Sequence, residues 1–198
     1  MNISTIGILL GIIVLLTIIG YVIYLTIITQ PLSLLFDGTG YTTFAASGDY
    51  NATKTNFSCD LKTVDSDGLI LHGKANDDDM FSIKLSGGVI IVEIDTGSGV
   101  VTLPSNTQVN NGEWHTINLV RDGQHISLKV DNEIVTSNTG AMTGITRPDI
   151  IYIGGSILDI SNTVQGFVGY MRNISFANRP VKDMEFDLSV GGVTIETH

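Results

Sequence analysis

The chain has 198 residues, and its 10 lysines and arginines against 20 aspartates and glutamates give a formal charge of −10. This acidic balance and the lack of a basic cluster exclude nucleic acid and anionic lipid surfaces as expected partners. Cys59 is the only cysteine, so no disulfide can form within these residues, and its strand-like surroundings predict a small buried residue rather than a reactive thiol.

The first predicted element is a transmembrane helix over residues 6–29, after a short tail of residues 1–5. Residues 6–28 carry no charge, and the first charged side chain in the chain is Asp37. About 20 apolar residues cross a hydrocarbon core of about 30 Å as a helix, and Pro31 would end that helix. The sequence therefore predicts a single-pass membrane protein with an N-terminal anchor in the lipid bilayer.

Two other interpretations of this run fit less well. A cleaved signal peptide would need a basic tail, a shorter apolar core and a small-residue cleavage site. A buried core helix would rarely be apolar on every side. The positive-inside rule leaves the orientation open, because the nearest lysine or arginine after the run is Lys54.

Residues 30–198 are predicted to form one all-β domain. Short apolar or alternating runs are separated by Gly, Asn and Asp, and no helical period appears after residue 30. Gly87, Gly88 and Gly123 predict tight hairpins, and Asp131 with Asn132 predicts a weaker one. Such a pattern is typical of an antiparallel two-sheet sandwich. The predicted strands are 32–36, 41–45, 56–63, 69–72, 80–85, 89–95, 100–103, 114–121, 125–131, 133–136, 150–153, 166–176 and 193–196.

Five motifs, in order, resemble those of laminin G-like domains of the concanavalin A-like lectin and glucanase superfamily. The resemblance covers nearly all of residues 31–198 and implies the jelly-roll sandwich of that family. The motifs are LIL at 69–71 with MFSIKLSGGV at 80–89, NNGEWHTI at 110–117, VRDG at 120–123 with LKVD at 128–131, YIGG at 152–155, and GFVGYMRNI at 166–174.

The chain departs from the family pattern at Tyr170, where a cysteine usually stands. The disulfide of the extracellular animal members therefore has no counterpart here. This departure argues against an ordinary animal matrix receptor and favours a bacterial, protist or viral relative.

The resemblance also implies a ligand-binding rim, often next to a calcium ion, for glycans, proteins or steroids. The family's calcium-ligand aspartate corresponds to Asp79, and Asp77 and Asp78 precede it in an acidic loop at the same rim. Calcium prefers several oxygen ligands that include carboxylates. The further ligand positions are Thr96, Gly144 and Thr146. The alternative is that residues 76–79 form a solvated acidic loop.

An enzymatic function is not expected. Glu93 and Asp95 resemble part of the catalytic strand of concanavalin A-like glucanases, and their spacing would put both on one face of a strand. Retaining hydrolysis needs a second catalytic carboxylate, and the sequence Thr-Gly-Ser-Gly follows instead. His115 lies in a fold motif without a nucleophile context, so a structural role is predicted for it.

Three sequons, at Asn51, Asn56 and Asn173, are candidate glycosylation sites if the domain lies outside the cell. The favoured function is a membrane-anchored, lectin-like recognition module that binds glycans or proteins. The alternative is a structural anchor that docks permanently onto an adjacent assembly, for example as a minor capsid or envelope protein of a membrane-containing virus.

Overall fold

A computed structural model describes residues 3–28, 33–45, 53–74, 80–140, 150–156, 165–177, 179–180 and 191–196. The chain divides into two compact units. The first unit contains helix α1, and the second, Ser33–Glu196, contains all the strands.

Helix α1 (Ile3–Ile28) confirms that the apolar run is helical. Its large apolar side chains with described positions are exposed, as Leu10 at 58% and Leu16 at 61% illustrate. Within the described part of the chain, no helix has the length and apolar character required to cross a membrane. The predicted span over residues 6–29 is therefore not supported.

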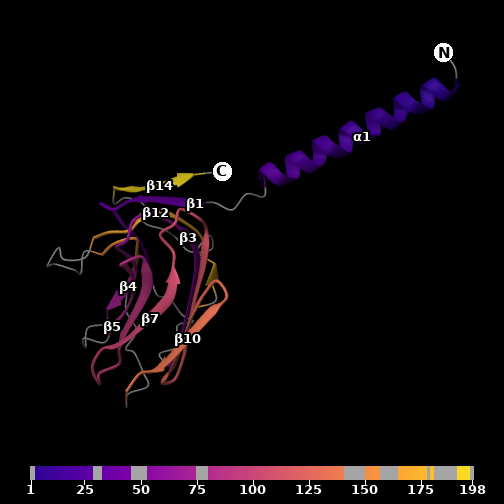
Figure 1. The fold of residues 1–198 in the computed structure, drawn as a ribbon. Coiled ribbons are helices and arrows are strands. Elements are labelled where there is room, and N and C mark those ends of the chain that lie inside the picture. Colours follow the sequence, from indigo (N-terminus) through magenta and orange to yellow (C-terminus); the bar gives the residue numbers. More distant parts are fainter. Residues whose placement is uncertain are drawn as a thin grey trace. The chain divides into compact units, whose positions relative to one another are not determined.

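The larger sheet has eight strands in the order β10-β9-β8-β3-β12-β1-β14, with β13 beside β12, and every pairing is antiparallel. Figure 1 labels β10, β3, β12, β1 and β14 of this sheet. Strand β3 lies in its middle, paired with β8 on one side and β12 on the other. The strands are β1 (Ser33–Asp37), β3 (Lys54–Lys62), β8 (His115–Asp122), β9 (His125–Val130), β10 (Glu133–Asn138), β12 (Val168–Phe176), β13 (Arg179–Pro180) and β14 (Val193–Glu196).

The smaller sheet has six antiparallel strands in the order β2-β11-β4-β5-β6-β7. Strands β4 to β7 follow one another along the chain and pair in sequence, whereas β11 returns from far along the chain to lie between β2 and β4. The strands are β2 (Thr42–Ala45), β4 (Gly68–Lys74), β5 (Met80–Ser86), β6 (Val89–Asp95), β7 (Val101–Gln108) and β11 (Ile150–Ile153).

The core lies between the two sheets, so the predicted antiparallel two-sheet sandwich is confirmed. Burial alternates residue by residue along β8, as expected for a strand with one face toward the core. Phe81 of the smaller sheet stacks on Phe176 of the larger one, with 5.7 Å between ring centroids. Cys59 is buried in this core, and that burial, together with the nearby Asp60 carboxylate, raises the pKa of the thiol far above its ordinary value.

The three predicted hairpins are present. Gly87 and Gly88 join β5 to β6 with φ of +59° and +83°, and Gly123 joins β8 to β9 with φ of +61°. Asp131 adopts φ of +53° between β9 and β10. Glycine tolerates this left-handed region at little cost, which explains its use in the two tighter turns.

The strand predicted at 100–103 is too short, because β7 runs from Val101 to Gln108. The strand continues through Pro104 because β7 is an edge strand, where a residue without a backbone N–H is tolerated. The Ser105 hydroxyl instead accepts a hydrogen bond from the Ile90 amide at 3.0 Å. Strand β13 was not predicted at all.

Candidate functional site

One end of the sandwich brings together two loops that we call the rim loops, residues 96–99 after β6 and residues 139–140 after β10. Met80 and Asp95 pair directly, so Thr96 leaves β6 at the end where β5 begins. A Cβ at Gly140 would lie 2.4 Å from the Ser98 hydroxyl oxygen, so the two loops are in close contact. Loops held on a rigid sheet in this way are common positions for binding residues.

Asp95 fixes the shape of the first rim loop. Its Oδ1 accepts hydrogen bonds from the Gly97 amide at 2.9 Å and the Gly99 amide at 3.1 Å. Both glycines have a positive φ, which an L side chain rarely adopts. The Thr96 side chain is buried, at 1% exposure.

Thr96 is the one predicted calcium ligand that lies among the described residues. Asp79, Gly144 and Thr146 lie outside them, as do Asp77 and Asp78 of the predicted rim. Among the residues that the structure describes, no group of three or more His, Cys, Asp or Glu side chains could hold a metal ion. The calcium site stays a prediction.

The two acids of the glucanase-like motif both make structural contacts. Glu93 Oε1 lies 2.7 Å from Lys84 Nζ, with both side chains about one quarter exposed. The Ser82 hydroxyl donates to the other oxygen of Glu93 at 3.4 Å. Because Asp95 holds the first rim loop, neither carboxylate is placed as a free catalytic group.

The outer face of the larger sheet carries a network centred on Asp60. Thr116 donates to Asp60 Oδ1 at 2.9 Å, while Asn173 and Arg172 donate to Oδ2 at 2.8 and 3.3 Å. The Arg172 guanidinium lies 4.0 Å from the centre of the Trp114 ring, which is a cation–π distance. The network joins β3, β8 and β12 across their outer surface.

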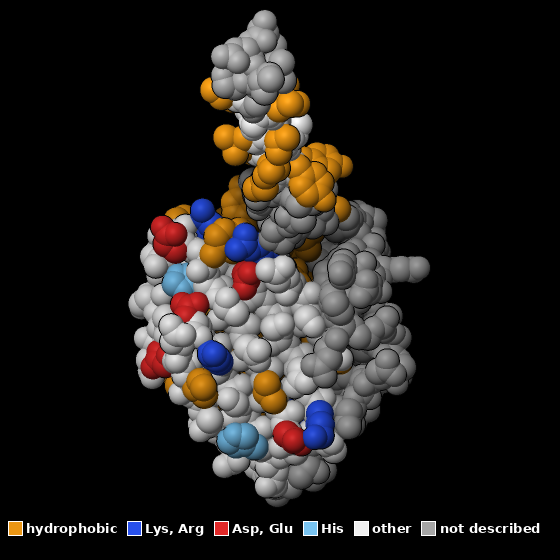
Figure 2. All heavy atoms as spheres, turned by 90° about the vertical axis from the view of Figure 1, so that its right-hand side faces the viewer, with side chains coloured by type: hydrophobic (Ala, Val, Ile, Leu, Met, Phe, Trp, Pro, Cys, Tyr) orange, Lys and Arg blue, Asp and Glu red, His pale blue; other side chains and the backbone are white. Residues whose placement is uncertain are grey.

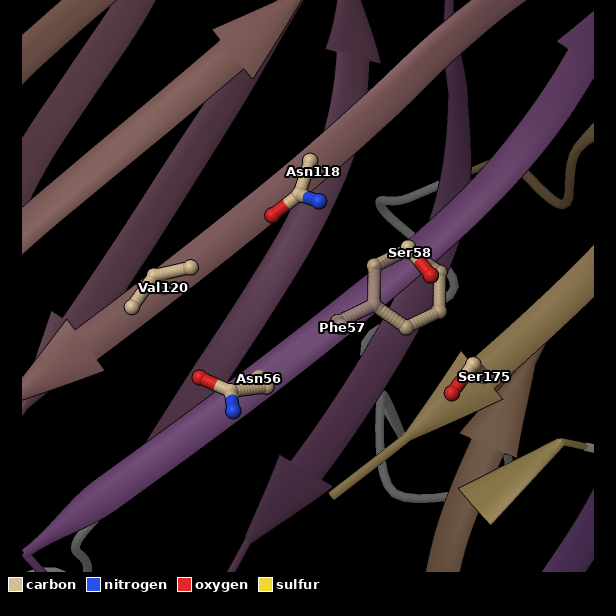
Figure 3. A pocket seen from close by; sticks show the side chains of 6 residues that line it. All are labelled: Asn56, Phe57, Ser58, Asn118, Val120 and Ser175. Atoms are coloured by element: carbon tan, nitrogen blue, oxygen red, sulfur yellow. The ribbon is translucent and has the colours of Figure 1, made fainter. Parts of the chain in front are cut away.

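A shallow hollow lies beside this network on the same sheet face (Figure 3). We call it the Asn118 hollow; its volume is about 130 Å³. Asn118 and Val120 rise from β8, Asn56 and Ser58 from β3, and Ser175 from β12. On the face in Figure 2, acidic and basic side chains are spread among uncharged ones, without a patch of one sign. The hollow offers amide and hydroxyl groups without a charge.

His115 supports the start of β8, as predicted from its motif. Its Nδ1 lies 2.7 Å from Asp131 Oδ2, and its Nε2 lies 2.8 Å from Asn111 Oδ1. Partial burial tends to raise the pKa of Asp131. The hydrogen bonds from His115 and from the Thr116 amide, with the charge of His115, outweigh that effect and leave the pKa of this carboxyl below its ordinary value.

The chain is similar in sequence and in fold to known proteins. A family model described as Laminin G domain matches residues 61–179. The chain belongs to the laminin G domain family. Its fold is also similar to the LG1-3 region of the laminin alpha2 chain, with a TM-score of 0.75, 24% identity, and coverage of 83% of this chain and 34% of that one. A native heptameric SAP-like pentraxin from Limulus polyphemus shares the fold alone, at a TM-score of 0.64 and 10% identity, over 85% of this chain and 95% of that one.

The curated relatives of this laminin G domain are much longer proteins. Laminin subunit alpha-1 from Homo sapiens is 32% identical over 160 residues, which cover 73% of this chain and 5% of the relative. The basement membrane-specific heparan sulfate proteoglycan core protein from Mus musculus is 34% identical over 114 residues, covering 54% of this chain and 3% of the relative. The chain thus spans a small fraction of the length of these relatives.

Two of the three predicted glycosylation sites in this laminin G domain are described. Asn56 lies within β3 and lines the Asn118 hollow. Asn173 is exposed on β12, with φ of +52°, and donates to Asp60. Asn51 lies outside the described residues. Glycosylation at these positions stays a prediction.

The Asn118 hollow and the Asp60 network were missed in the sequence. The alternation of polar residues along β3 and β8 could have placed Ser58 and Asn118 on an outer face. Their neighbour Ser175 depends on a register shift in β12, and no local pattern indicates that shift.

Replacing Asp131 with asparagine is expected to lower stability at neutral pH. A carboxyl whose pKa is lowered by folding binds fewer protons in the native state, so it stabilises the fold above its unfolded pKa of about 3.9 and loses that effect as the pH falls through the folded value. Urea unfolding of both proteins at pH 7 and pH 3 checks this. A difference in stability that is equal at both pH values would contradict the assignment.

Proposed function

We propose that this laminin G domain is a non-enzymatic recognition module that binds glycans or proteins at the rim loops. The observation that carries the proposal is the contact between Ser98 and Gly140, which joins a loop of the smaller sheet to a loop of the larger one. A site on two sheets at once is held more rigidly than a site on one loop. The structural contacts of Glu93 and Asp95 support the non-enzymatic part.

Calcium at this rim belongs to the same proposal. Asp79 would supply a carboxylate, with Thr96, Gly144 and Thr146 as the other ligand positions, and Asp77 and Asp78 would add negative charge nearby. Hard oxygen ligands of this kind suit calcium. A bound calcium ion would supply positive charge at the rim for an oxygen-bearing ligand.

Replacing Asp79 with alanine is expected to abolish calcium binding by the full chain, because it removes the principal proposed carboxylate ligand. Isothermal titration with calcium measures this directly, and binding to a glycan array with and without a chelator measures its consequence. Glu113→Gln is a matched control, since Glu113 is an exposed acid that precedes β8, away from the rim loops. Calcium binding that survives Asp79→Ala unchanged would refute this assignment.

A further part of the proposal is that α1 attaches the chain to a lipid bilayer. Its support lies in the sequence, where residues 6–28 are uncharged, and in the exposed apolar side chains of the described part of the helix. In that case the chain should stay with membranes after alkaline carbonate washing and be released only by detergent. Release by carbonate alone would contradict attachment.

The same preparation tests the alternative of a structural anchor. Co-purification of one protein in a fixed ratio, without glycan binding, would favour docking onto an adjacent assembly. Protease protection in sealed vesicles would show on which side of the membrane the domain lies.

A further inference from the structure

We propose that the Asn118 hollow is a second binding site, and that its ligand is one uncharged sugar residue. None of its lining residues belongs to the rim loops, so it is separate from the site proposed above. It lies on the outer face of the larger sheet, across β8, β3 and β12, where the strands themselves hold the side chains in position.

The first argument is that the hollow contains hydrogen-bonding groups that the fold does not use. Over the described residues, the side chains of Ser58, Asn118 and Ser175 make no hydrogen bond. The neighbouring row contrasts with this, because Asp60 accepts hydrogen bonds from Thr116, Arg172 and Asn173. One row of the face is occupied in holding the sheet together, and the next row is open to solvent or to a ligand.

The second argument concerns how these groups are brought together. Ser58 pairs with Asn118 on one side and with Ser175 on the other, so the three form a continuous row across three strands. Directly opposed side chains in an antiparallel sheet lie about 5 Å apart at their Cβ atoms. Such a row can contact several groups of one small ligand.

A β-bulge in β12 makes this row possible. Arg172 pairs with Asp60 and Ser175 pairs with Ser58, so two residues of β12 lie opposite Cys59 alone. Bulges bend a strand and redirect its side chains, and they are frequent near functional sites. Without the shift, Ser175 would lie on the core side of the sheet.

The lining decides the class of ligand. Its amides and hydroxyls carry no charge, and the charged pairs on either side, Asp60 with Arg172 and Lys54 with Asp122, are already joined to each other. Lys129 pairs with Asn118 across β8 and β9 and is exposed, but it is not part of the lining, so the lining itself offers an anion no cation. An added peptide strand is excluded because β3 is paired on both sides. Of the hollow's two apolar lining residues, Phe57 is buried and Val120 is 42% exposed, so a purely apolar partner would find little apolar surface.

A sugar ring fits the uncharged amide and hydroxyl groups of the hollow and the exposed Val120 beside them. Its hydroxyls can exchange hydrogen bonds with amide and hydroxyl side chains, and its C–H groups can lie against Val120. The volume of about 130 Å³ suits one ring rather than an extended chain. Sites of this kind orient a ligand with a few well-placed polar groups.

The test uses the full chain, made in bacteria so that no glycan is attached, and held in a detergent without a sugar headgroup. Glucose, galactose, mannose and N-acetylglucosamine are titrated while the side-chain amide signals of Asn56 and Asn118 are followed by NMR. Asn118→Ala assigns its own signal by removing it. N-acetylneuraminic acid tests the charge preference, and glycerol tests for general polyol effects.

We expect a saturable shift of both amide signals with at least one neutral sugar. Loss of one or two neutral hydrogen bonds should raise the Kd about five- to tenfold in Ser58→Ala and in Asn118→Ala. Asn138→Ala is the matched control, because Asn138 is an exposed amide of β10 on the same sheet, outside the hollow, and it should leave the Kd unchanged.

The proposal is overturned if no neutral sugar gives a saturable shift at 50 mM, if glycerol or N-acetylneuraminic acid gives an equal one, or if Asn138→Ala weakens binding as much as Ser58→Ala. Thermal unfolding of each variant confirms that it is folded. None of these results bears on calcium at the rim, so this proposal and the proposed function can fail separately.

Discussion

Replacing Gly154 with alanine is expected to lower the free energy of unfolding by about 4 kcal/mol or more, a large part of the stability of a typical domain. A Cβ at Gly154 would lie 2.1 Å from two ring atoms of Phe36. Phe36 is fully buried and its ring is edge-on to Phe167, so it has no free space to move into. The φ of +82° at Gly154 adds the strain of an L residue in the left-handed region.

The backbone around Gly154 makes the position still less tolerant. Its amide donates to the Ile70 carbonyl at 3.0 Å, and its carbonyl accepts from the Phe167 amide at 2.8 Å. A shift of the backbone to relieve the clash with Phe36 would break these two bonds. The chain therefore cannot avoid the added methyl group by a local movement.

Gly123→Ala separates the two causes, because Gly123 also has a positive φ, of +61°, but a Cβ there would meet nothing within 4 Å. It should cost only about 1 kcal/mol, from backbone strain alone. Urea unfolding of both variants measures the difference. If both variants lost the same amount of stability, the close approach of Phe36 would not be the reason why position 154 needs glycine.

Gly154 also shows what the sequence could and could not predict. The YIGG motif placed Gly154 in the laminin G family pattern. The position needs glycine because of its contact with Phe36, more than 100 residues earlier in the chain. Hairpins such as the one at Gly123 depend on neighbouring residues, so they were predicted with correct positions. Strand order depends on distant pairings such as β1 with β12, which a local pattern does not contain.

The candidate sites also differ in whether a local sequence pattern could predict them. Thr96 was found through the family motif, whereas Asp95, which holds the first rim loop, was considered only as part of a glucanase-like motif. The Asn118 hollow needs three strands in a specific register, with a bulge in one of them. Alternation in each strand predicts which residues face outward, but only the pairing decides which of them meet.

The second large effect is expected at Asp60, where alanine should lower the free energy of unfolding by about 2–3 kcal/mol. The change removes the acceptor of three hydrogen bonds and leaves the donors on Thr116, Arg172 and Asn173 without it. The Asp60 side chain is 18% exposed and that of Arg172 is 27% exposed, so water can replace the lost bonds only in part. Arg172 would keep its contact with the Trp114 ring, which limits the loss.

The ion pair of Lys54 with Asp122 is a matched control on the same two strands, β3 and β8. Its atoms lie 2.9 Å apart, but its side chains are 56% and 62% exposed. Exposed pairs of this kind contribute little, so Asp122→Ala should cost less than about 0.5 kcal/mol. Urea unfolding of both variants decides whether burial and the number of partners, rather than the presence of a charge pair, set the stability of this face. If Asp122→Ala cost as much as Asp60→Ala, the Asp60 network would have no special part in joining β3, β8 and β12, and the distinction between an occupied row and an open one would lose its basis.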